Sequence, residues 1–119
     1  MLKMDRKYSY LLLDEKSSIR DALIHIKNNQ SRHVFIKSDD EKIIGVISEG
    51  DILDALLKGS DISSRISDLI NRSFIFLTED DANNKSEILR ILNQGILIIP
   101  VLDNEMKLVD IINYLDYLD

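Results

Sequence analysis

The chain has 119 residues, of which 45% are hydrophobic, and its 15 Lys and Arg against 21 Asp and Glu give a formal net charge of −6. This length fits one compact domain or two very small units that share a core, and the hydrophobic content excludes a disordered chain. The absence of Cys excludes a disulfide framework, a thiolate metal site and a cysteine nucleophile, while the acidic balance argues against nucleic acid as a partner.

The first predicted elements are a short strand and an amphipathic helix. Residues 10–13 form an apolar run of strand length. Ser18, followed three residues later by Asp21, is an acidic variant of a capping box and marks the start of a helix that ends near Asn29. The residues that recur at helical spacing and should face a core are Ile19, Ala22, Leu23 and Ile26.

A hairpin and a second helix are predicted next. Residues 33–37 and 42–48 are rich in β-forming side chains, and the charged link at 38–41 between them favours a hairpin. A helix then begins after Ser48 and closes at Gly59. Its expected apolar stripe consists of Ile52, Leu53, Leu56 and Leu57.

The second half of the chain repeats this order of elements. The expected elements are a connecting helix at 62–70, a strand at 74–77, a helix at 81–93, a hairpin formed by 97–102 and 107–112, and a final helix from residue 113. Sliding the chain by 65 residues places Ser48 on Asn113 and Asp51 on Asp116. Two copies at so long a period indicate a tandem duplication, so we expect two pseudo-symmetric units at residues 1–59 and 60–119.

The junction of strand and helix at residues 45–51 is the most informative segment. A helix N-terminus presents unpaired N–H groups and the positive end of the helix dipole, which suit a phosphate. Gly45 leaves room for another backbone or a flat base, Ser48 can cap the helix or donate to a phosphate oxygen, and Asp51 can accept the hydroxyls of a ribose. Taken alone, these residues favour a simpler interpretation, with Ser48 as an N-cap and Asp51 as an acid that compensates the dipole.

The order of elements, the duplication and two motifs together resemble the CBS domain, named after cystathionine β-synthase and usually found as a tandem pair, the Bateman module. The motifs are glycine, two hydrophobic residues, Ser, two spacers and Asp at 45–51, and the Ile-Pro-Val-Leu-Asp run at 99–103. The resemblance implies an α/β (α+β) fold in which two pseudo-symmetric strand-helix-strand-strand-helix units pack their sheets together.

The resemblance also implies a regulatory module that binds AMP, ADP, ATP or S-adenosylmethionine in a cleft between its sheets. No separate cofactor is implied. The residues that it assigns to the first cleft are Leu12, Leu13, Arg32, His33, Val34, Gly45, Ser48 and Asp51. Of these, Ser48 would approach a phosphate, Asp51 would hold the ribose, and Arg32 is a cation near the phosphate. An equally open interpretation of His33 is a solvent-exposed histidine at the end of a strand.

The second copy departs from this pattern. Asp110 stands where the glycine should be, and Asn113 replaces the Ser or Thr. This copy also carries the whole net charge, with 5 basic and 11 acidic residues in 60–119. We therefore expect at most one competent cleft, and assign only a weaker second site to Pro100, Asn113 and Asp116.

Catalysis finds little support, because the sequence has no P-loop, no pair of His at metal spacing and no nucleophile elbow. The alternative function is a ligand-free module for dimerisation or interaction. With either function we expect a homodimer that forms through the helices. This alternative draws on the apolar and aromatic side chains of the terminal helix, which are Tyr114, Leu115, Tyr117 and Leu118.

The setting of the chain is predicted from its ends and its longest apolar run. The run at 96–102 is far shorter than the about 20 residues of a membrane span. Residues 1–10 contain no apolar core of a signal peptide, so we expect a cytoplasmic protein without a membrane partner. Because the final helix stops abruptly at Asp119, we expect a catalytic domain to follow, and the closest resemblance is to the CBS segment of bacterial sugar-phosphate nucleotidyltransferases.

Overall fold

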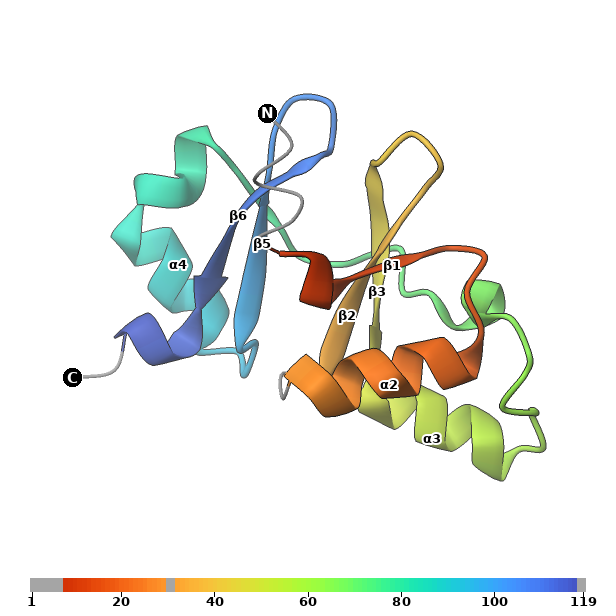
Figure 1. The fold of residues 1–119 in the computed structure, drawn as a ribbon. Helices are drawn as coiled ribbons and strands as arrows, with labels where there is room; N and C mark the ends of the chain where they lie inside the picture. The colour runs from red at the N-terminus through yellow and green to blue at the C-terminus, as the bar shows by residue number, and fades with distance from the viewer. Residues whose placement is uncertain (1–7, 30–31, 118–119) are drawn as a thin grey trace.

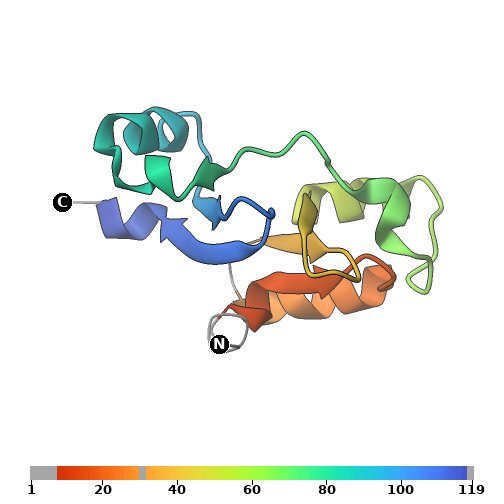
Figure 2. The same cartoon turned by 90° about the horizontal axis from the view of Figure 1, so that it is seen from above.

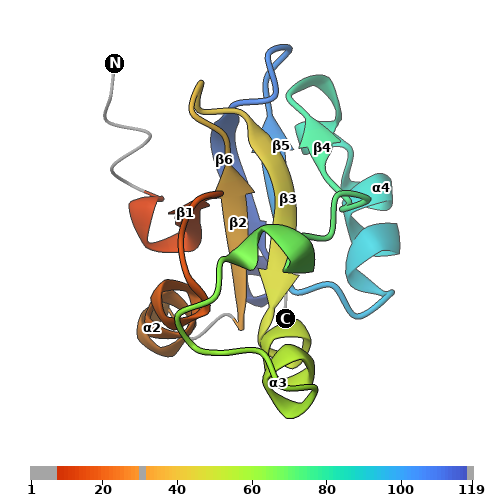
Figure 3. The same cartoon turned by 90° about the vertical axis from the view of Figure 1, so that its right-hand side faces the viewer.

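Two three-stranded sheets, one from each half of the chain, face each other at the centre of the computed structural model, which describes residues 8–29 and 32–117 (Figure 1). The first sheet has the order β1 (Leu12–Asp14), β2 (His33–Lys37), β3 (Ile43–Ser48), and the second has the order β4 (Leu77–Thr78), β5 (Ile98–Leu102), β6 (Leu108–Asn113). In each sheet the first strand is parallel to the middle strand, and the hairpin is antiparallel. Seen from its end, the molecule has the hairpins of the two sheets stacked on each other (Figure 3).

In the described part of the chain, three α-helices flank the sheets on their outer sides. Helices α2 (Ile19–Asn29) and α3 (Glu49–Leu57) lie side by side against the first sheet, and α4 (Lys85–Leu92) covers the second (Figures 1 and 3). Short 3-10 turns complete the fold at Ser9–Leu11, Ile66–Leu69, Asp80–Asn83 and Tyr114–Tyr117. The predicted capping box of α2 is confirmed: Ser18 N donates to Asp21 Oδ2 at 3.0 Å, and Asp21 N donates to Ser18 Oγ at 3.2 Å. The hydrogen bond from the backbone N of Ser18 holds the pKa of the Asp21 carboxyl below its ordinary value.

The two hairpins repeat each other residue by residue, which confirms the predicted duplication. The hairpin pairs His33 with Ser48 in the first unit and Ile98 with Asn113 in the second, a shift of 65 residues on each strand. Each hairpin has an irregularity at the equivalent place, Ile36/Lys37 and Val101/Leu102. The turn residues with positive φ, at 68° for Glu41 and 66° for Met106, are also 65 residues apart.

Four predicted elements of the second half differ in the structure. Residues 62–70 form one 3-10 turn within a loop, because the side chain of Asp61 binds the backbone N of Ser63 and because Ser64 O and Ile66 N bond to the start of α2. The predicted strand at 74–77 is reduced to Leu77–Thr78, and the final helix is a 3-10 turn. The predicted helix at 81–93 is divided, because Asn84 Oδ1 accepts from Glu87 N and starts α4 anew.

In the first half, the differences are smaller. Strand β1 begins at Leu12, two residues later than predicted, because the preceding residues form a 3-10 turn. On α3, Ile52 is fully buried and Leu56 packs against the core, but Leu53 is 51% exposed and Leu57 is 87% exposed. The predicted apolar stripe of α3 is therefore only half covered within this chain.

The buried residues form one cluster in each unit and a third cluster between the units. The first cluster packs α2 and α3 on one face of β2, with Val34 and Ile36 at its centre. The third cluster lies on the opposite face of β2, where Phe35 meets Leu102 and Leu108 of the second unit. Ile66 packs in the first cluster, so the chain after residue 59 still contributes to the first unit; the predicted boundary at 59/60 stays a prediction.

Candidate functional site

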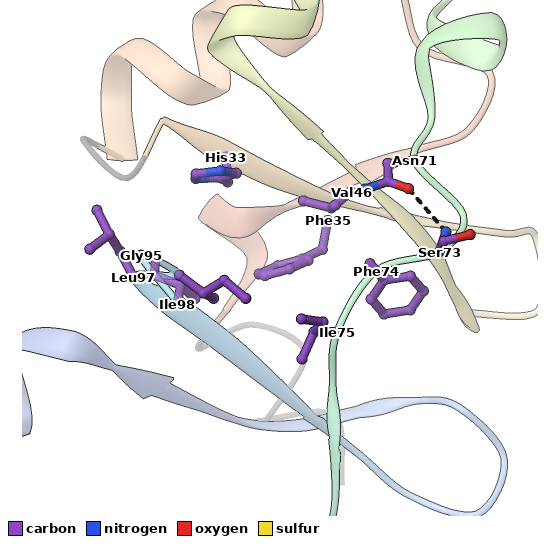
Figure 4. Close-up of a pocket in the computed structure, with 11 residues that line it drawn as sticks. His33, Phe35, Val46, Asn71, Ser73, Phe74, Ile75, Gly95, Leu97 and Ile98 are labelled. Carbon is purple, nitrogen blue, oxygen red and sulfur yellow. Dashed lines mark hydrogen bonds between the residues drawn. The ribbon is translucent and has the colours of Figure 1, made fainter. Parts of the chain in front are cut away.

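A cavity of about 270 Å³ lies between the two units. It is lined from the first unit by the β2–β3 hairpin, from the second unit by the start of β5, and along one side by the linker that joins the units, residues 71–75 (Figure 4). Figure 2 shows the linker running from the first unit to the second. The lining residues are His33, Phe35, Val46, Asn71, Ser73, Phe74, Ile75, Gly95, Ile96, Leu97 and Ile98. Apolar side chains dominate this set, and neither a carboxylate nor a Lys or Arg side chain occurs among the described lining residues.

The linker is held in place by the edge of β3. Asn71 N donates to Val46 O at 2.9 Å, and Val46 N donates to Asn71 O at 3.1 Å, so the linker adds one antiparallel bridge to the sheet. The Asn71 side chain then accepts a hydrogen bond from Ser73 N at 3.0 Å and turns the chain toward the cavity (Figure 4). These bonds make the linker a fixed wall of the cavity.

Gly45 is required by this close approach. A Cβ atom built at Gly45 would collide with the Ile70 side chain and would lie 2.7 Å from Asn71 O. Of the two partners that the sequence left open for Gly45, another backbone and a flat base, the structure places a backbone there.

The end of the cavity at His33 adjoins the start of α3. His33 pairs with Ser48 across the hairpin, and Ser48 is the N-cap of α3. Next to this pair, Glu49 N donates to Arg32 O at 2.9 Å, and Arg32 Nε lies 3.8 Å from Glu49 Oε1. The predicted cation Arg32 is therefore beside an acidic partner.

The start of α3 contains a complete capping box, which confirms the simpler interpretation of Ser48 and Asp51. Asp51 N donates to Ser48 Oγ at 3.1 Å, and Ser48 N donates to Asp51 Oδ2 at 3.2 Å. Ser48 is half-buried and Asp51 is exposed. The Ser48 hydroxyl hydrogen and Asp51 Oδ1 take no part in the two hydrogen bonds of the capping box. Their predicted contacts with a ligand stay predictions.

The remaining residues predicted for the first cleft lie elsewhere. Val34 and Leu13 are buried in the first core cluster, and Leu12 packs in the cluster between the units. Asp51 also borders a shallow concavity on the outer side of α3, with Asp54 and Asp68. His33 is thus the one residue of the predicted eight that lines the cavity.

Most of the cavity wall was missed by the sequence prediction. The alternation of side chains along a strand gives a signal for one of the missed residues, since Phe35 lies on the same face of β2 as His33. The linker residues from Asn71 to Ile75 gave no comparable signal, because 71–73 were assigned to no element and Phe74 and Ile75 were predicted as part of the strand at 74–77.

In the second unit, Tyr8 lies where the linker lies in the first. Tyr8 and Ser73 are 65 residues apart, as are Gly45 and Asp110. The Tyr8 hydroxyl donates to Asp110 Oδ1 at 2.6 Å, and Ile111 N donates to the same oxygen at 2.8 Å. The carboxylate of Asp110 thus fills the space that the glycine leaves for a backbone in the first unit.

The three residues predicted for the weaker second site have structural roles in this arrangement. Pro100 is buried and pairs with Ile111 in the hairpin. Asn113 Oδ1 accepts from Leu115 N at 2.9 Å, and Asp116 borders a concavity beside α4. Their binding of a ligand stays a prediction.

Tyr8 makes a testable contribution to stability at alkaline pH. Burial, together with the hydrogen bond to Asp110 and its negative charge, raises the pKa of Tyr8 to about 12. Because the folded pKa exceeds the ordinary value of 10, neutral Tyr8 stabilises the fold below pH 10, and this stabilisation is lost as the pH rises toward 12. We expect Tyr8→Phe to remove up to about 3 kcal/mol of pH-dependent stability between these values.

The measurement is urea denaturation of both proteins from pH 8 to 12. The variant should be less stable by about 1 kcal/mol at pH 8, owing to the lost hydrogen bond, and this difference should shrink and then reverse as the pH rises toward 12, because only the unsubstituted protein loses the contribution of neutral Tyr8. Parallel pH profiles of the two proteins would contradict this assignment.

Within residues 8–29 and 32–117, His, Asp and Glu side chains form no group of three that could hold a metal ion. None of the described helices is long and apolar enough to cross a membrane.

The first unit matches a known family model, and the fold of the whole chain is that of known structures. Residues 4–58 match the family model of the CBS domain. The chain is 33% identical over 55 residues to an uncharacterized protein of Helicobacter pylori (strain J99), and the alignment covers 46% of this chain but only 17% of that protein.

Solved structures show that the whole chain has the fold of a tandem CBS domain pair. The CBS domains of a transcriptional regulator from Streptococcus pneumoniae align over 92% of this chain and 87% of theirs, with a TM-score of 0.75 and 17% identity. The CBS domain protein PAE2072 from Pyrobaculum aerophilum, complexed with AMP, aligns over 89% of this chain and 81% of its own, with a TM-score of 0.72 and 20% identity. The CBS pair of protein MJ0100, complexed with 5′-methylthioadenosine and S-adenosylmethionine, aligns over 89% of this chain and 82% of its own, with a TM-score of 0.70 and 22% identity.

Proposed function

We propose that this chain is a non-catalytic regulatory module that binds an adenosine-type ligand between its two units and transmits the bound state to an attached or partner enzyme. The observation that carries the proposal is the cavity between the units, which adjoins the start of α3 through the pair His33–Ser48. Two proteins of the same fold are complexed with ligands of this class, AMP in one and 5′-methylthioadenosine and S-adenosylmethionine in the other.

The cavity has the chemistry of a site for a flat ring. Apolar walls from Phe35 and Val46 on one side and Ile98 on the other can stack against a heteroaromatic base. Asn71 and Ser73 add polar atoms to the wall, and these can select a base by hydrogen bonds. A base of this kind would bury its apolar faces and keep its polar edge paired.

The ribose would then lie at the start of α3. The Ser48 hydroxyl can donate a hydrogen bond, and Asp51 Oδ1, which is outside the capping box, can accept from ribose hydroxyls. A ligand in the cavity would fasten the second unit to the β2–β3 hairpin of the first, because the cavity walls come from both units. Such a ligand would change the relative freedom of the two units, which is a physical route for regulation.

The test is calorimetry with AMP, ADP, ATP and S-adenosylmethionine. We expect at least one of them to bind, and Asp51→Ala to weaken its binding by about tenfold or more, as the loss of a charged hydrogen-bond partner does. The matched control is Asp21→Ala, which breaks the equivalent capping box of α2 away from the cavity and should leave the affinity unchanged. If none of the four ligands binds, or if both variants weaken binding equally, the proposed function is wrong.

An interaction module is the second candidate, and the exposed apolar side chains of the helices favour it. Leu57 and Leu53 of α3 and Ile24 of α2 are 87%, 51% and 45% exposed. At the other end of the molecule Leu115 is 68% exposed, while Leu118, which was predicted to join it, lies outside the described residues. A molecular mass in solution that stays dimeric on dilution, together with no binding of the four ligands by calorimetry, would favour this candidate and the predicted homodimer.

The wider setting of the module also belongs to the proposal. A catalytic domain after Asp119, its assignment to a sugar-phosphate nucleotidyltransferase, a bacterial source and a cytoplasmic location rest on the sequence alone and stay predictions.

A further inference from the structure

We propose that the two units pivot about a joint at their hairpin turns, so that whatever fills the cavity at the opposite end sets the distance between α3 and the 3-10 turn Tyr114–Tyr117. The uneven distribution of contacts between the units along their strands carries this proposal. As a route of regulation it rests on the proposed function, because it names the movement by which a bound ligand would be reported.

The hairpin turns of the two units are joined through the backbone. Ile43 N, at the start of β3, donates to Met106 O, in the turn between β5 and β6, at 2.8 Å. Met106 has a positive φ of 66°, and its side chain packs against the cluster between the units. Hinges between rigid bodies consist of a few residues in loops or at the ends of elements, and this contact has both.

Buried contacts between the hairpins gather at the same end. Ile43 begins β3, Leu102 ends β5 and Leu108 begins β6, and all three are buried in the cluster between the units. The hydrogen bond from the Tyr8 hydroxyl to Asp110 Oδ1, at 2.6 Å, ties the segment before β1 to β6. The end of the hairpins that carries the turns therefore holds the units together.

At the opposite end of the strands, the cavity separates the two units. His33 begins β2 and Ile98 begins β5, and these half-buried residues lie on opposite walls of the cavity (Figure 4). Leu97 beside them is 45% exposed. Side chains that border a cavity lack packing partners on that side, so this end resists a change of spacing less than the packed end does.

The linker permits a change of spacing at this end. It is bonded to β3 at Asn71 and pairs with the second sheet at Leu77. Residues 72–76 between these two points form no helix or strand, so a movement of the units breaks no regular element there.

The hairpins carry the spacing at the cavity to the surface of the molecule. Strand β3 ends at Ser48, where α3 begins, and β6 ends at Asn113, where the turn Tyr114–Tyr117 begins. Figure 1 shows both hairpin turns at the top, with α3 and this blue 3-10 turn in the lower part on opposite sides. A rotation about the joint therefore changes the distance between these two surfaces and leaves the hairpin turns in contact.

The test measures distances between spin labels by double electron–electron resonance, since a chain without Cys accepts labels at chosen pairs of sites. Leu53→Cys with Leu115→Cys reports the cavity end, because these residues are 51% and 68% exposed on α3 and on the turn after β6. Asp40→Cys with Glu105→Cys reports the hairpin turns, where the side chains are 66% and 70% exposed. Dilution with unlabelled protein restricts the measurement to distances within one chain.

The cavity is filled with and without a ligand. Ile98→Trp and, from the linker, Ile75→Trp each place a large ring at the cavity. AMP, ADP, ATP and S-adenosylmethionine are added separately to the protein without these changes. We expect each Trp variant, and each ligand that binds, to shift the distance at the cavity end by about 2 Å or more and the distance at the turns by less than about 1 Å. The matched control is Ile24→Trp, at a residue of α2 that is 45% exposed and outside the cavity lining, which should shift neither distance.

The outcomes separate the joint from the proposed function. Equal shifts at both ends, or no shift at either end, for the folded Trp variants would overturn the joint. A ligand that binds by calorimetry and moves neither pair of labels would overturn it too and keep the proposed function. Shifts at the cavity end for the Trp variants, with none of the four ligands binding, would support the joint and show that the proposed function is wrong. Circular dichroism identifies a Trp variant that does not fold, and the other variant and the ligands then decide the result.

Discussion

Gly45→Ala is expected to lower the free energy of unfolding by about 2–3 kcal/mol, because an added methyl group in a packed site forces the surrounding chain to move. The Cβ atom would lie 2.7 Å from the backbone oxygen of Asn71 and would collide with Ile70. The backbone of the linker is tied to β3 by two hydrogen bonds, so it cannot move aside without losing them. Because Asn71 and Ser73 line the cavity, the same change should weaken any ligand that binds there.

The matched control for this prediction is Gly50→Ala. A Cβ atom at Gly50 has the Ser48 hydroxyl as its nearest neighbour, at 3.8 Å, and the residue is in α3. Alanine is a better helix former than glycine by about 1 kcal/mol, so this variant should be as stable as the unsubstituted protein or slightly more so. Urea denaturation measures both variants. Equal stability of the two would show that the linker does not press against β3.

Phe35→Ala is expected to have the largest effect on stability, about 3–4 kcal/mol, through the removal of a large buried ring. Phe35 is 3% exposed and lies in the cluster between the units, where it meets Leu102 and Leu108. The ring also lines the cavity, so its loss should enlarge the cavity and loosen the contact between the two sheets.

Ile75→Ala is the comparison for Phe35→Ala, since Ile75 lines the same cavity but is 40% exposed. We expect this variant to lose about 1 kcal/mol, because little of the removed surface is buried. Thermal denaturation followed by circular dichroism measures both. Similar losses for the two variants would mean that the cluster between the units contributes little to holding them together.

Local side-chain rules were enough to predict much of the fold. The capping box of Ser18 and Asp21 depends on residues three apart in the chain and forms as predicted. Ser48 caps α3 as the simpler interpretation expected, and Asp51 completes a capping box with it. The hairpins and their 65-residue repeat were also predicted, since alternating apolar runs on either side of a polar turn fix the pairing.

The predictions failed where distant contacts decide the local structure. Residues 62–70 have the pattern of a helix, yet Ser64 and Ile66 bond to the backbone of the first unit and hold the segment in a loop. The cavity was missed for a related reason. Strand β2 is buried on both faces, so the apolar character of Val34 and Phe35 does not tell which of them faces the second unit. Only the packing of the two sheets settles that question.

The bridge between Asn71 and Val46 also bears on how the protein avoids association with itself. Strand β3 is the outer strand of its sheet, and an outer strand with open N–H and C=O groups is a template for pairing with another chain. The linker pairs with the N–H and C=O groups of Val46, and in the second sheet the equivalent N–H group, that of Ile111, donates to the carboxylate of Asp110. The duplicated sheets thus protect their edges by two different means, and a fragment that ended before Asn71 would leave the edge of β3 open to aggregation.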